Sequence, residues 1–422
     1  MIKEYYQAEE LETMAKKLFE HERDIKRLDG WFRAKEIYEE TMEQYPDTPH
    51  VLRTAYALRN IVEKLPLYID EYNVFAGTQR DAFAKSYALI NPNFKVSTFN
   101  GYCDPTEVFG DIEPNEEFTR ERIECVKEKN RESDYVRTLK QVYDSAENDT
   151  AEVAYFIEQV TGHLIPDFRK ALRYGIDALR DEIRKNMEGA DADRRIQYEA
   201  MYHTLETAQV LAQRYAEIAE GDMNAADDRR KGQLKLMRDT LKKISHSGAE
   251  NLYEAIQLFL ILWQVMCLEQ TPNPFAFSVG NADRIFEPYR AAEGLEREMA
   301  AGLFKHFLVF FNVGDRSWAI SQNVLIGGKD TEGKDLTNLT SYALLDAYYA
   351  MSLPQPILSV KLHKGTPDAL YEELGKFFFT PGCLTPSFFN DDSVFEVLRM
   401  HGVDAEDLPD YSVAGCQEPL IM

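Results

Sequence analysis

Two kinds of hydrophobic pattern divide this sequence near residue 247, and the division limits the folds that the chain can adopt. Before it, stretches such as 53–65 and 167–188 repeat apolar positions at helical spacing. After it, two short runs rich in strand-forming residues, 322–328 and 356–363, are bounded by Gly or Pro and alternate with helical stretches. This alternation predicts an α/β barrel or a layered sheet that follows a mainly helical N-terminal part.

The helices expected beside these strands are also visible in the sequence. Residues 337–351 and 368–379 have helical spacing, and residues 251–270 are apolar nearly all round, which predicts a buried helix. The longest apolar run, 258–268, is too short to span a bilayer. Because α/β proteins place much of their chemistry in loops that follow strands, we expect the site in those loops.

Charge and cysteine content exclude several classes of function. The formal net charge is −24, which repels phosphate backbones and anionic membrane surfaces, and no basic patch offsets it, so we expect neither nucleic-acid nor membrane binding. The sequence begins without a secretory signal pattern, which indicates a cytoplasmic protein. Five scattered cysteines without a C-x-x-C pair argue against a disulfide framework and against a metal site.

The final residues contain the run Gly415-Cys416-Gln417-Glu418, which combines a thiol with a carboxylate. In an extended loop, residues two apart point to the same side, so Cys416 and Glu418 would face one substrate. The carboxylate opposes thiolate formation, and no His is close in sequence to act as a base, which disfavours a nucleophilic cysteine. A neutral thiol suits hydrogen-atom transfer instead, with the carboxylate removing a hydroxyl proton. The alternative is a loop cysteine beside a surface acid.

The order of segments around this run resembles the glycyl radical enzymes of the pyruvate formate-lyase superfamily, in their dehydratase and eliminating-lyase branch. The resemblance covers nearly the whole chain and is strongest in the motifs VLIGG, LPQPILSV, TPSFFND and AGCQEP. It implies an α/β fold in which a helical N-terminal part, residues 1–247, precedes part of a ten-stranded α/β barrel, residues 248–422. It also implies that Cys416 forms the thiyl radical and that Glu418 is the general base.

The same resemblance suggests residues that bind substrate. His163, in TGHLIPD, occupies the place of a substrate-facing histidine in diol dehydratases; the alternative is a histidine that caps a helix or binds a buried carbonyl. Where glycerol-type members carry His and Ser, this chain has Phe275 and Ala276, which implies a more apolar pocket. Trp318 is expected either to line that pocket or to pack in the core.

Departures from the family pattern leave alternatives for the activity. The founding acyl-transfer enzymes use two adjacent cysteines, whereas Ala414 and Gly415 precede a single thiol here, so a pyruvate formate-lyase-type C-acetyltransferase is the less favoured alternative. The chain contains no RVxGY-like stretch to store a glycyl radical, and we expect that C-terminal domain to lie beyond Met422. A catalytically incompetent or split product is the other alternative.

The resemblance also implies partners. A small hydroxylated or amine-bearing molecule would be the substrate, no cofactor would be bound apart from the organic glycyl radical of the full-length protein, and a separate radical S-adenosylmethionine enzyme would generate that radical. A homodimer is possible for this family. The substrate and its leaving group (water, amine, sulfonate or carboxylate) stay open at this point.

Overall fold

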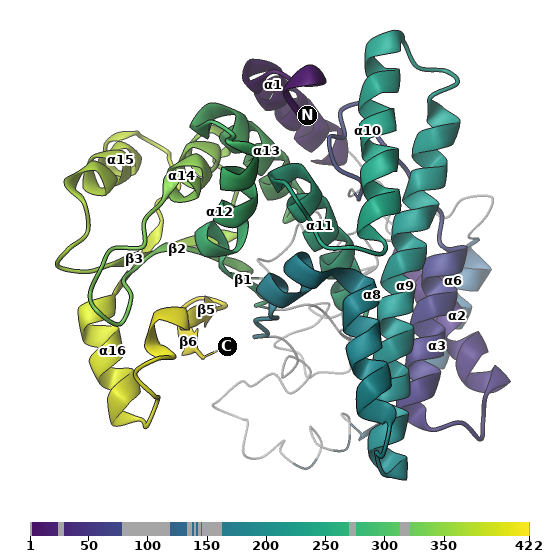
Figure 1. Ribbon diagram of the computed structural model, residues 1–422. Helices are drawn as coiled ribbons and strands as arrows, with labels where there is room; N and C mark the ends of the chain where they lie inside the picture. Colours follow the sequence, from purple (N-terminus) through teal and green to yellow (C-terminus); the bar gives the residue numbers. More distant parts are fainter. Residues whose placement is uncertain are drawn as a thin grey trace.

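The computed structural model describes residues 2–23, 29–77, 119–132, 163–269, 276–312 and 321–421, together with positions 137, 138, 141 and 145. Figure 1 shows long helices of the N-terminal part on one side and a sheet with its helices on the other, with helix α11 (Leu252–Glu269) between them. Buried apolar side chains from both sides form one continuous cluster. The domain boundary near residue 247 stays a prediction.

Aspartate caps fix where three of the N-terminal helices begin. Asp167, Asp191 and Asp227 each accept a hydrogen bond from the backbone N–H three residues later. Such a cap satisfies an N–H that would otherwise lack a partner and places negative charge at the positive end of the helix dipole. The elements are η1 (Ile2–Glu4), α1 (Ala8–Arg23), α2 (Asp29–Gln44), α3 (His50–Lys64), α6 (Arg120–Arg131), α8 (Phe168–Met187), α9 (Ala192–Asp222) and α10 (Asp228–Ile244).

Helix α11 is the hydrophobic centre of the described chain. Its Phe259 and Trp263 are fully buried. The ring centroid of Phe259 lies 4.3 Å from that of Phe168 on α8 and 5.3 Å from that of Phe307 on α13 (Arg297–Phe310). The helix therefore joins the N-terminal helices to the α/β part, and the predicted buried helix is confirmed.

Four parallel strands form the sheet, and they follow one another in chain order. Neighbouring parallel strands need a crossover, which the intervening helices supply. The strands are β1 (Ser278–Asn281), β2 (Asn323–Gly327), β3 (Ile357–Leu362) and β4 (Ser387–Asn390), and the helices are α12 (Ala282–Glu293), α13, α14 (Leu339–Met351), α15 (Asp368–Phe379) and α16 (Asp391–Met400). The strands and helices predicted after residue 320 are thus confirmed, and so is the α/β class.

A buried histidine joins α1 to α13. Nε2 of His306 donates a hydrogen bond to the Leu11 carbonyl at 3.0 Å. Burial lowers the pKa of His306 to about 3, because the charged ring would lose its hydration there. The ring is therefore neutral in the folded protein at neutral pH.

We expect this histidine to make stability depend on pH. Between its ordinary pKa of 6.5 and about 3, the unfolded state binds a proton that the folded state does not, so the free energy of unfolding falls as the pH falls. The slope from one such group is about 1.4 kcal/mol per pH unit. Urea denaturation at about pH 7 and about pH 5 should show a smaller loss for His306→Gln than for the wild type. Equal losses would contradict the assignment of a neutral buried ring.

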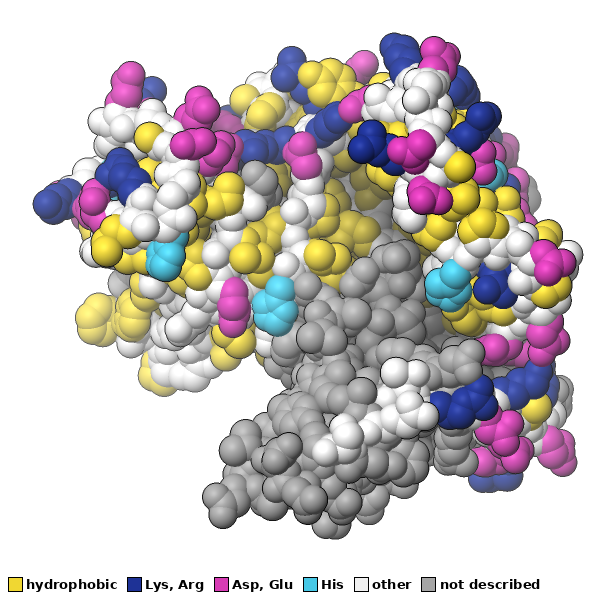
Figure 2. All heavy atoms as spheres, turned by 90° about the horizontal axis from the view of Figure 1, so that it is seen from below, with side chains coloured by type: hydrophobic (Ala, Val, Ile, Leu, Met, Phe, Trp, Pro, Cys, Tyr) yellow, Lys and Arg dark blue, Asp and Glu magenta, His cyan; other side chains and the backbone are white. Residues whose placement is uncertain are grey.

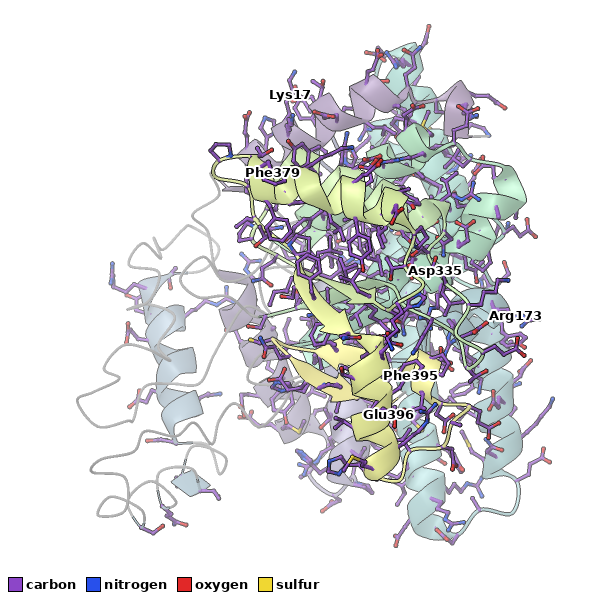
Figure 3. The ribbon with its side chains drawn as sticks, turned by 90° about the vertical axis from the view of Figure 1, so that its left-hand side faces the viewer. Lys17, Arg173, Asp335, Phe379, Phe395 and Glu396 are labelled. Carbon is purple, nitrogen blue, oxygen red and sulfur yellow. The ribbon has the colours of Figure 1, made fainter. Side chains whose placement is uncertain are left out.

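Truncation of a buried ring in α11 should destabilise the whole chain. We expect Phe259→Ala to lower the free energy of unfolding by about 3–5 kcal/mol, because it leaves a cavity among packed aromatic rings. The matched control is Phe379→Ala at the end of α15 (Figure 3), whose side chain is 87% exposed. That variant should stay within about 0.5 kcal/mol of the wild type. Chemical denaturation measures both, and comparable losses would show that α11 is not the core.

Candidate active site

The Gly-Cys-Gln-Glu run forms the tip of a β-hairpin. Strands β5 (Ser412–Ala414) and β6 (Glu418–Leu420) pair antiparallel, and residues 415–417 form the turn between them. The expectation of an extended loop is therefore wrong. Because the chain reverses at Cys416, the carboxylate of Glu418 folds back over the turn, where Oε2 accepts the N–H of Gln417 at 2.9 Å.

Gly415 is the point at which three of the predicted site residues meet. Its φ is +59°, a left-handed conformation that favours glycine. A Cβ placed on Gly415 would lie 2.8 Å from Oε2 of Glu418, 3.0 Å from Cβ of Ala276 and 3.1 Å from Nε2 of His163. Only a glycine leaves room for these groups. The turn therefore brings the carboxylate and the imidazole together beside Cys416.

The Cys416 side chain is exposed at this tip, with a hydroxyl group near its sulfur. Oγ of Ser321 lies 3.7 Å from Sγ of Cys416. Ser321 itself is buried, 8% exposed, and stands two residues before β2. The thiol therefore faces solvent on one side and the start of β2 on the other.

Unusual backbone conformations gather at the same place. His163, Ala276 and Ser321 all have left-handed φ angles, of 54°, 60° and 53°. In the described chain only Ser352 joins them among residues other than glycine. A left-handed φ is costly for a residue with a Cβ, and such residues cluster at functional sites. Their position around one turn, at Gly415 and Cys416, is a second indication of a site.

The stem of the hairpin, residues 409–411 that lead into β5, is anchored by two buried side chains, Lys361 and Asp391. Nζ of Lys361 donates to the carbonyl oxygens of Pro409 and Tyr411, each at 3.0 Å, and to Oδ1 of Asn281 at 3.1 Å. Burial lowers the pKa of Lys361 to about 7. The Tyr411 hydroxyl donates to Oδ1 of Asp391 at 2.6 Å. Both side chains thus bind the segment that leads into β5.

The hairpin crosses the sheet rather than extending from one edge. Its stem contacts Lys361 and Asp391 at the carboxyl ends of β3 and β4, whereas its tip contacts residues at the amino ends of β1 and β2. We expected the chemistry in loops that follow strands; the turn does follow β5, but it lies at the amino ends of the parallel strands β1 and β2. The reason is that β5 runs against the strand direction, so the thiol reaches the opposite edge from the stem.

The sequence identified part of this site. Cys416, Glu418, His163 and Ala276 are brought together, whereas Phe275 and Trp318 lie outside the described residues. The sequence reasoning missed two residues that bind the turn, Ser321 and Asn323. Their only signal was the polar run 321–323 immediately before an apolar strand, which calls for buried hydrogen-bond partners.

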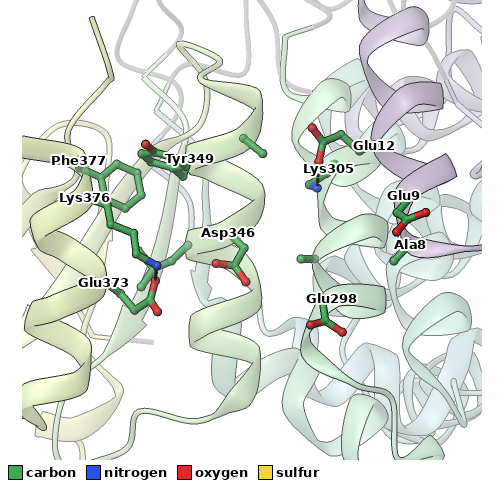
Figure 4. Close-up of a pocket in the computed structure, with 13 residues that line it drawn as sticks. Ala8, Glu9, Glu12, Glu298, Lys305, Asp346, Tyr349, Glu373, Lys376 and Phe377 are labelled. Carbon is green, nitrogen blue, oxygen red and sulfur yellow. Dashed lines mark hydrogen bonds and ion pairs between the residues drawn. The ribbon is translucent and has the colours of Figure 1, made fainter. Parts of the chain in front are cut away.

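Two other hollows lie away from this hairpin. A groove of about 380 Å³ lies between α1, α13, α14 and α15, and both of its lysines are paired, Lys305 with Glu12 and Lys376 with Glu373 (Figure 4). An apolar groove of about 770 Å³ lies among α3, α8, α9 and α11. Neither contains Cys416 or Glu418, so the hairpin stays the candidate active site.

The face of the molecule in Figure 2 carries charged side chains of both signs. On the face in Figure 2, Lys and Arg side chains alternate with Asp and Glu, and the coloured residues show no continuous basic patch. Among the described helices, none is both long and apolar enough to cross a membrane. Within the same residues, no cluster of His, Cys, Asp and Glu has the arrangement of a metal site.

The fold and the hairpin together define an α/β protein that presents a thiol and a carboxylate on one turn at the edge of a parallel sheet. Residues 2–422 match the family model described as pyruvate formate lyase-like. The chain therefore belongs to the pyruvate formate lyase-like family.

Relatives and solved structures agree with this membership. Isethionate sulfite-lyase of Oleidesulfovibrio alaskensis is 24% identical over 434 residues, covering 92% of this chain and 50% of that protein. (2S)-3-sulfopropanediol dehydratase of Klebsiella oxytoca is 24% identical over 413 residues, covering 90% and 49%. The glycerol-bound B12-independent glycerol dehydratase of Clostridium butyricum has a TM-score of 0.77 at 24% identity, covering 92% of this chain and 52% of that one.

The structure of hydroxyproline dehydratase from Clostridioides difficile, with its substrate bound, has a TM-score of 0.79 at 22% identity and covers 97% of this chain and 55% of that one. The fold expected from the resemblance is confirmed. This chain spans about half the length of these relatives.

Loss of one hydrogen bond in the stem should weaken the hairpin's attachment. Tyr411→Phe removes the hydroxyl that binds Asp391, and we expect the free energy of unfolding to fall by about 1–3 kcal/mol because a buried carboxylate loses a donor. Tyr371→Phe, on a side chain that is 47% exposed, is the control and should change stability by less than about 0.5 kcal/mol. Equal effects in urea denaturation would show that the stem bond contributes nothing.

Proposed function

We propose that this chain carries the substrate-activating part of a glycyl radical eliminating lyase. The observation that carries the proposal is the convergence of Glu418 and His163 on Gly415, directly beside the Cys416 thiol. Membership in the pyruvate formate lyase-like family supports it. So do the names of relatives, which include dehydratases and sulfite-lyases.

In the proposed reaction, a thiyl radical on Cys416 takes the hydrogen atom from a carbon that bears a hydroxyl group, so a C–H bond breaks and an S–H bond forms. Glu418 accepts the hydroxyl proton, which leaves a ketyl radical anion. This species expels the leaving group from the neighbouring carbon with the electron pair of that bond. The resulting α-carbonyl radical takes a hydrogen atom back from Cys416 and regenerates the thiyl radical. The net change is elimination of the leaving group with a proton.

His163 and Ala276 would define the pocket around these steps. We propose that the His163 imidazole binds the substrate hydroxyl or the departing group, because Nε2 lies at the turn next to the Glu418 carboxylate. The Ala276 methyl group offers only an apolar surface at the same point. The proposed substrate is a small hydroxylated molecule, the chemical class that the names sulfopropanediol, hydroxyproline and glycerol share among the relatives. That Phe275 and Trp318 line the substrate pocket stays a prediction.

The radical itself would come from outside these 422 residues. We propose that a glycyl radical on further polypeptide oxidises Cys416, and that a separate radical S-adenosylmethionine enzyme generates the glycyl radical. The assembled enzyme is this chain together with that polypeptide after anaerobic activation. The resemblance to glycyl radical enzymes and the half-length match to the relatives support this arrangement.

Substitutions at the turn test the proposal in the assembled enzyme. We expect Cys416→Ser to abolish turnover, because an alcohol O–H bond is too strong to be formed and broken reversibly in place of S–H. Glu418→Gln should lower kcat by about 10²–10⁴-fold, the usual contribution of a general base. Product formation is measured by mass spectrometry across a panel of small hydroxylated substrates.

The controls are a thiol and a carboxylate outside the hairpin. Cys383→Ser alters a half-buried cysteine after α15, and Glu396→Gln alters a residue on α16 that Figure 3 labels beside Phe395. Both should retain the wild-type rate within about twofold, as expected for substitutions away from the site. Turnover by Cys416→Ser at the control rate would exclude the thiyl mechanism.

A further inference from the structure

We infer that Asn323 is a positioning residue for the Cys416 thiol, acting through the peptide group that joins Gly415 to Cys416. Its Nδ2 donates a hydrogen bond to the Gly415 carbonyl oxygen at 2.9 Å. That carbonyl belongs to the same planar unit as the backbone nitrogen of Cys416. A fixed direction of the Gly415 carbonyl therefore fixes the plane of the peptide group to which the Cys416 Cα, and with it the side chain, is attached.

The Gly415 residue is held from both sides. Its N–H donates to the Ala276 carbonyl at 3.1 Å, while its C=O accepts from Asn323. Ala276 precedes β1 and Asn323 begins β2, so two adjacent strands bind one residue of the turn. Since Gly415 is also the residue on which Glu418 and His163 converge, this pair of bonds sets the thiol relative to both groups.

The Asn323 side chain is itself fixed. It is fully buried, and Nδ2 also donates to Oγ of Ser359 on β3 at 3.0 Å. Both Nδ2 hydrogens are thus in use, and the orientation of the amide is decided by the Gly415 carbonyl, which can only accept. The backbone N–H of Asn323 donates to the Phe277 carbonyl at 3.0 Å. A rigid donor of this kind is what a positioning role requires.

Stability alone does not account for this asparagine. Strands β2 and β3 are already joined by backbone pairing over five residue pairs, so the sheet does not need the side chain. Within the described chain, Oδ1 of Asn323 is buried without a hydrogen-bond partner. An unpaired buried carbonyl oxygen destabilises a fold. The side-chain amide of Asn323 therefore lowers stability through its unpaired Oδ1. Its contribution is the hydrogen bond from Nδ2 to the Gly415 carbonyl.

The thiol has few other restraints. The Cys416 side chain is exposed, and among the described residues its sulfur has a polar contact with Oγ of Ser321 at 3.7 Å. Among the described residues, the carboxylate of Glu418 accepts a hydrogen bond from the backbone of the same turn, at Gln417. Without the Asn323 bond, the carbonyl of the Gly415–Cys416 peptide group would lose its hydrogen bond to the sheet, and the distance from Sγ to the substrate carbon would vary.

Amide hydrogen exchange on the 422-residue chain tests the inference without any turnover. Asn323→Leu keeps a similar side-chain size and removes the donor. We expect the Gly415 amide to exchange about tenfold faster in this variant, because its partner bond loosens with the turn, while the β2 amides stay as protected as in the wild type. Equal acceleration of the Gly415 amide and of β2 would indicate a merely structural role and would overturn the inference.

The matched control is Ser359→Ala, which removes the other acceptor of the same Nδ2 but leaves the bond to Gly415. It should leave Gly415 exchange within about twofold of the wild type. If Asn323→Leu does not fold, amide exchange of the wild-type protein still tests the inference. Its Gly415 amide must be protected nearly as well as those of β2, and rapid exchange there overturns the inference.

A second readout rests on the proposed function. In the assembled enzyme, Asn323→Leu should lower kcat by about 10²-fold with KM changed less than about twofold, because a displaced reacting atom slows chemistry more than binding. If Cys416→Ser retains turnover, the proposed function fails while the exchange result for Asn323 stands. If turnover needs Cys416 but not Asn323, the positioning role fails and the proposed function stands.

Discussion

The hydrogen bonds between the cysteine hairpin and the parallel sheet are the interactions on which the candidate site depends. Lys361 and Asp391 bind the stem at one edge of the sheet, and Asn323 with the Ala276 carbonyl binds Gly415 near the other. The bonds at the stem hold the segment before β5, and the bonds at the tip fix the direction of the Gly415 peptide groups. A short hairpin that would be marginal by itself thereby acquires a fixed position.

The rest of the fold makes this position rigid. Helix α11 packs Phe259 between Phe168 on α8 and Phe307 on α13, so the N-terminal helices and the sheet share one core. His163 lies just before α8, and Ala276 lies just before β1. The two residues approach the turn from different parts of the chain. Their separation therefore depends on this shared core.

Much of the fold could be predicted from the sequence, because its signals are local. The alternation around 322–328 and 356–363 gives strands, and the all-round apolar composition of 251–270 gives a buried helix. The chemistry proposed for the turn rests on residue types, since a thiol beside a carboxylate suits few reactions. The hairpin could not be predicted from the sequence, because Gly415 and Glu418 approach each other only after the chain reverses. Asn323 and Ser321 were missed because their partners lie roughly 90 residues away in sequence.

The central claim is that Cys416 takes a hydrogen atom from the hydroxyl-bearing carbon of the substrate. The most direct measurement uses the assembled enzyme and a substrate with a CD₂OH group, and follows where deuterium appears in the product. We expect one deuterium to move to the neighbouring carbon through the Cys416 sulfur and turnover to show a primary isotope effect. A product whose neighbouring carbon carries only solvent hydrogen, formed without an isotope effect, would contradict it.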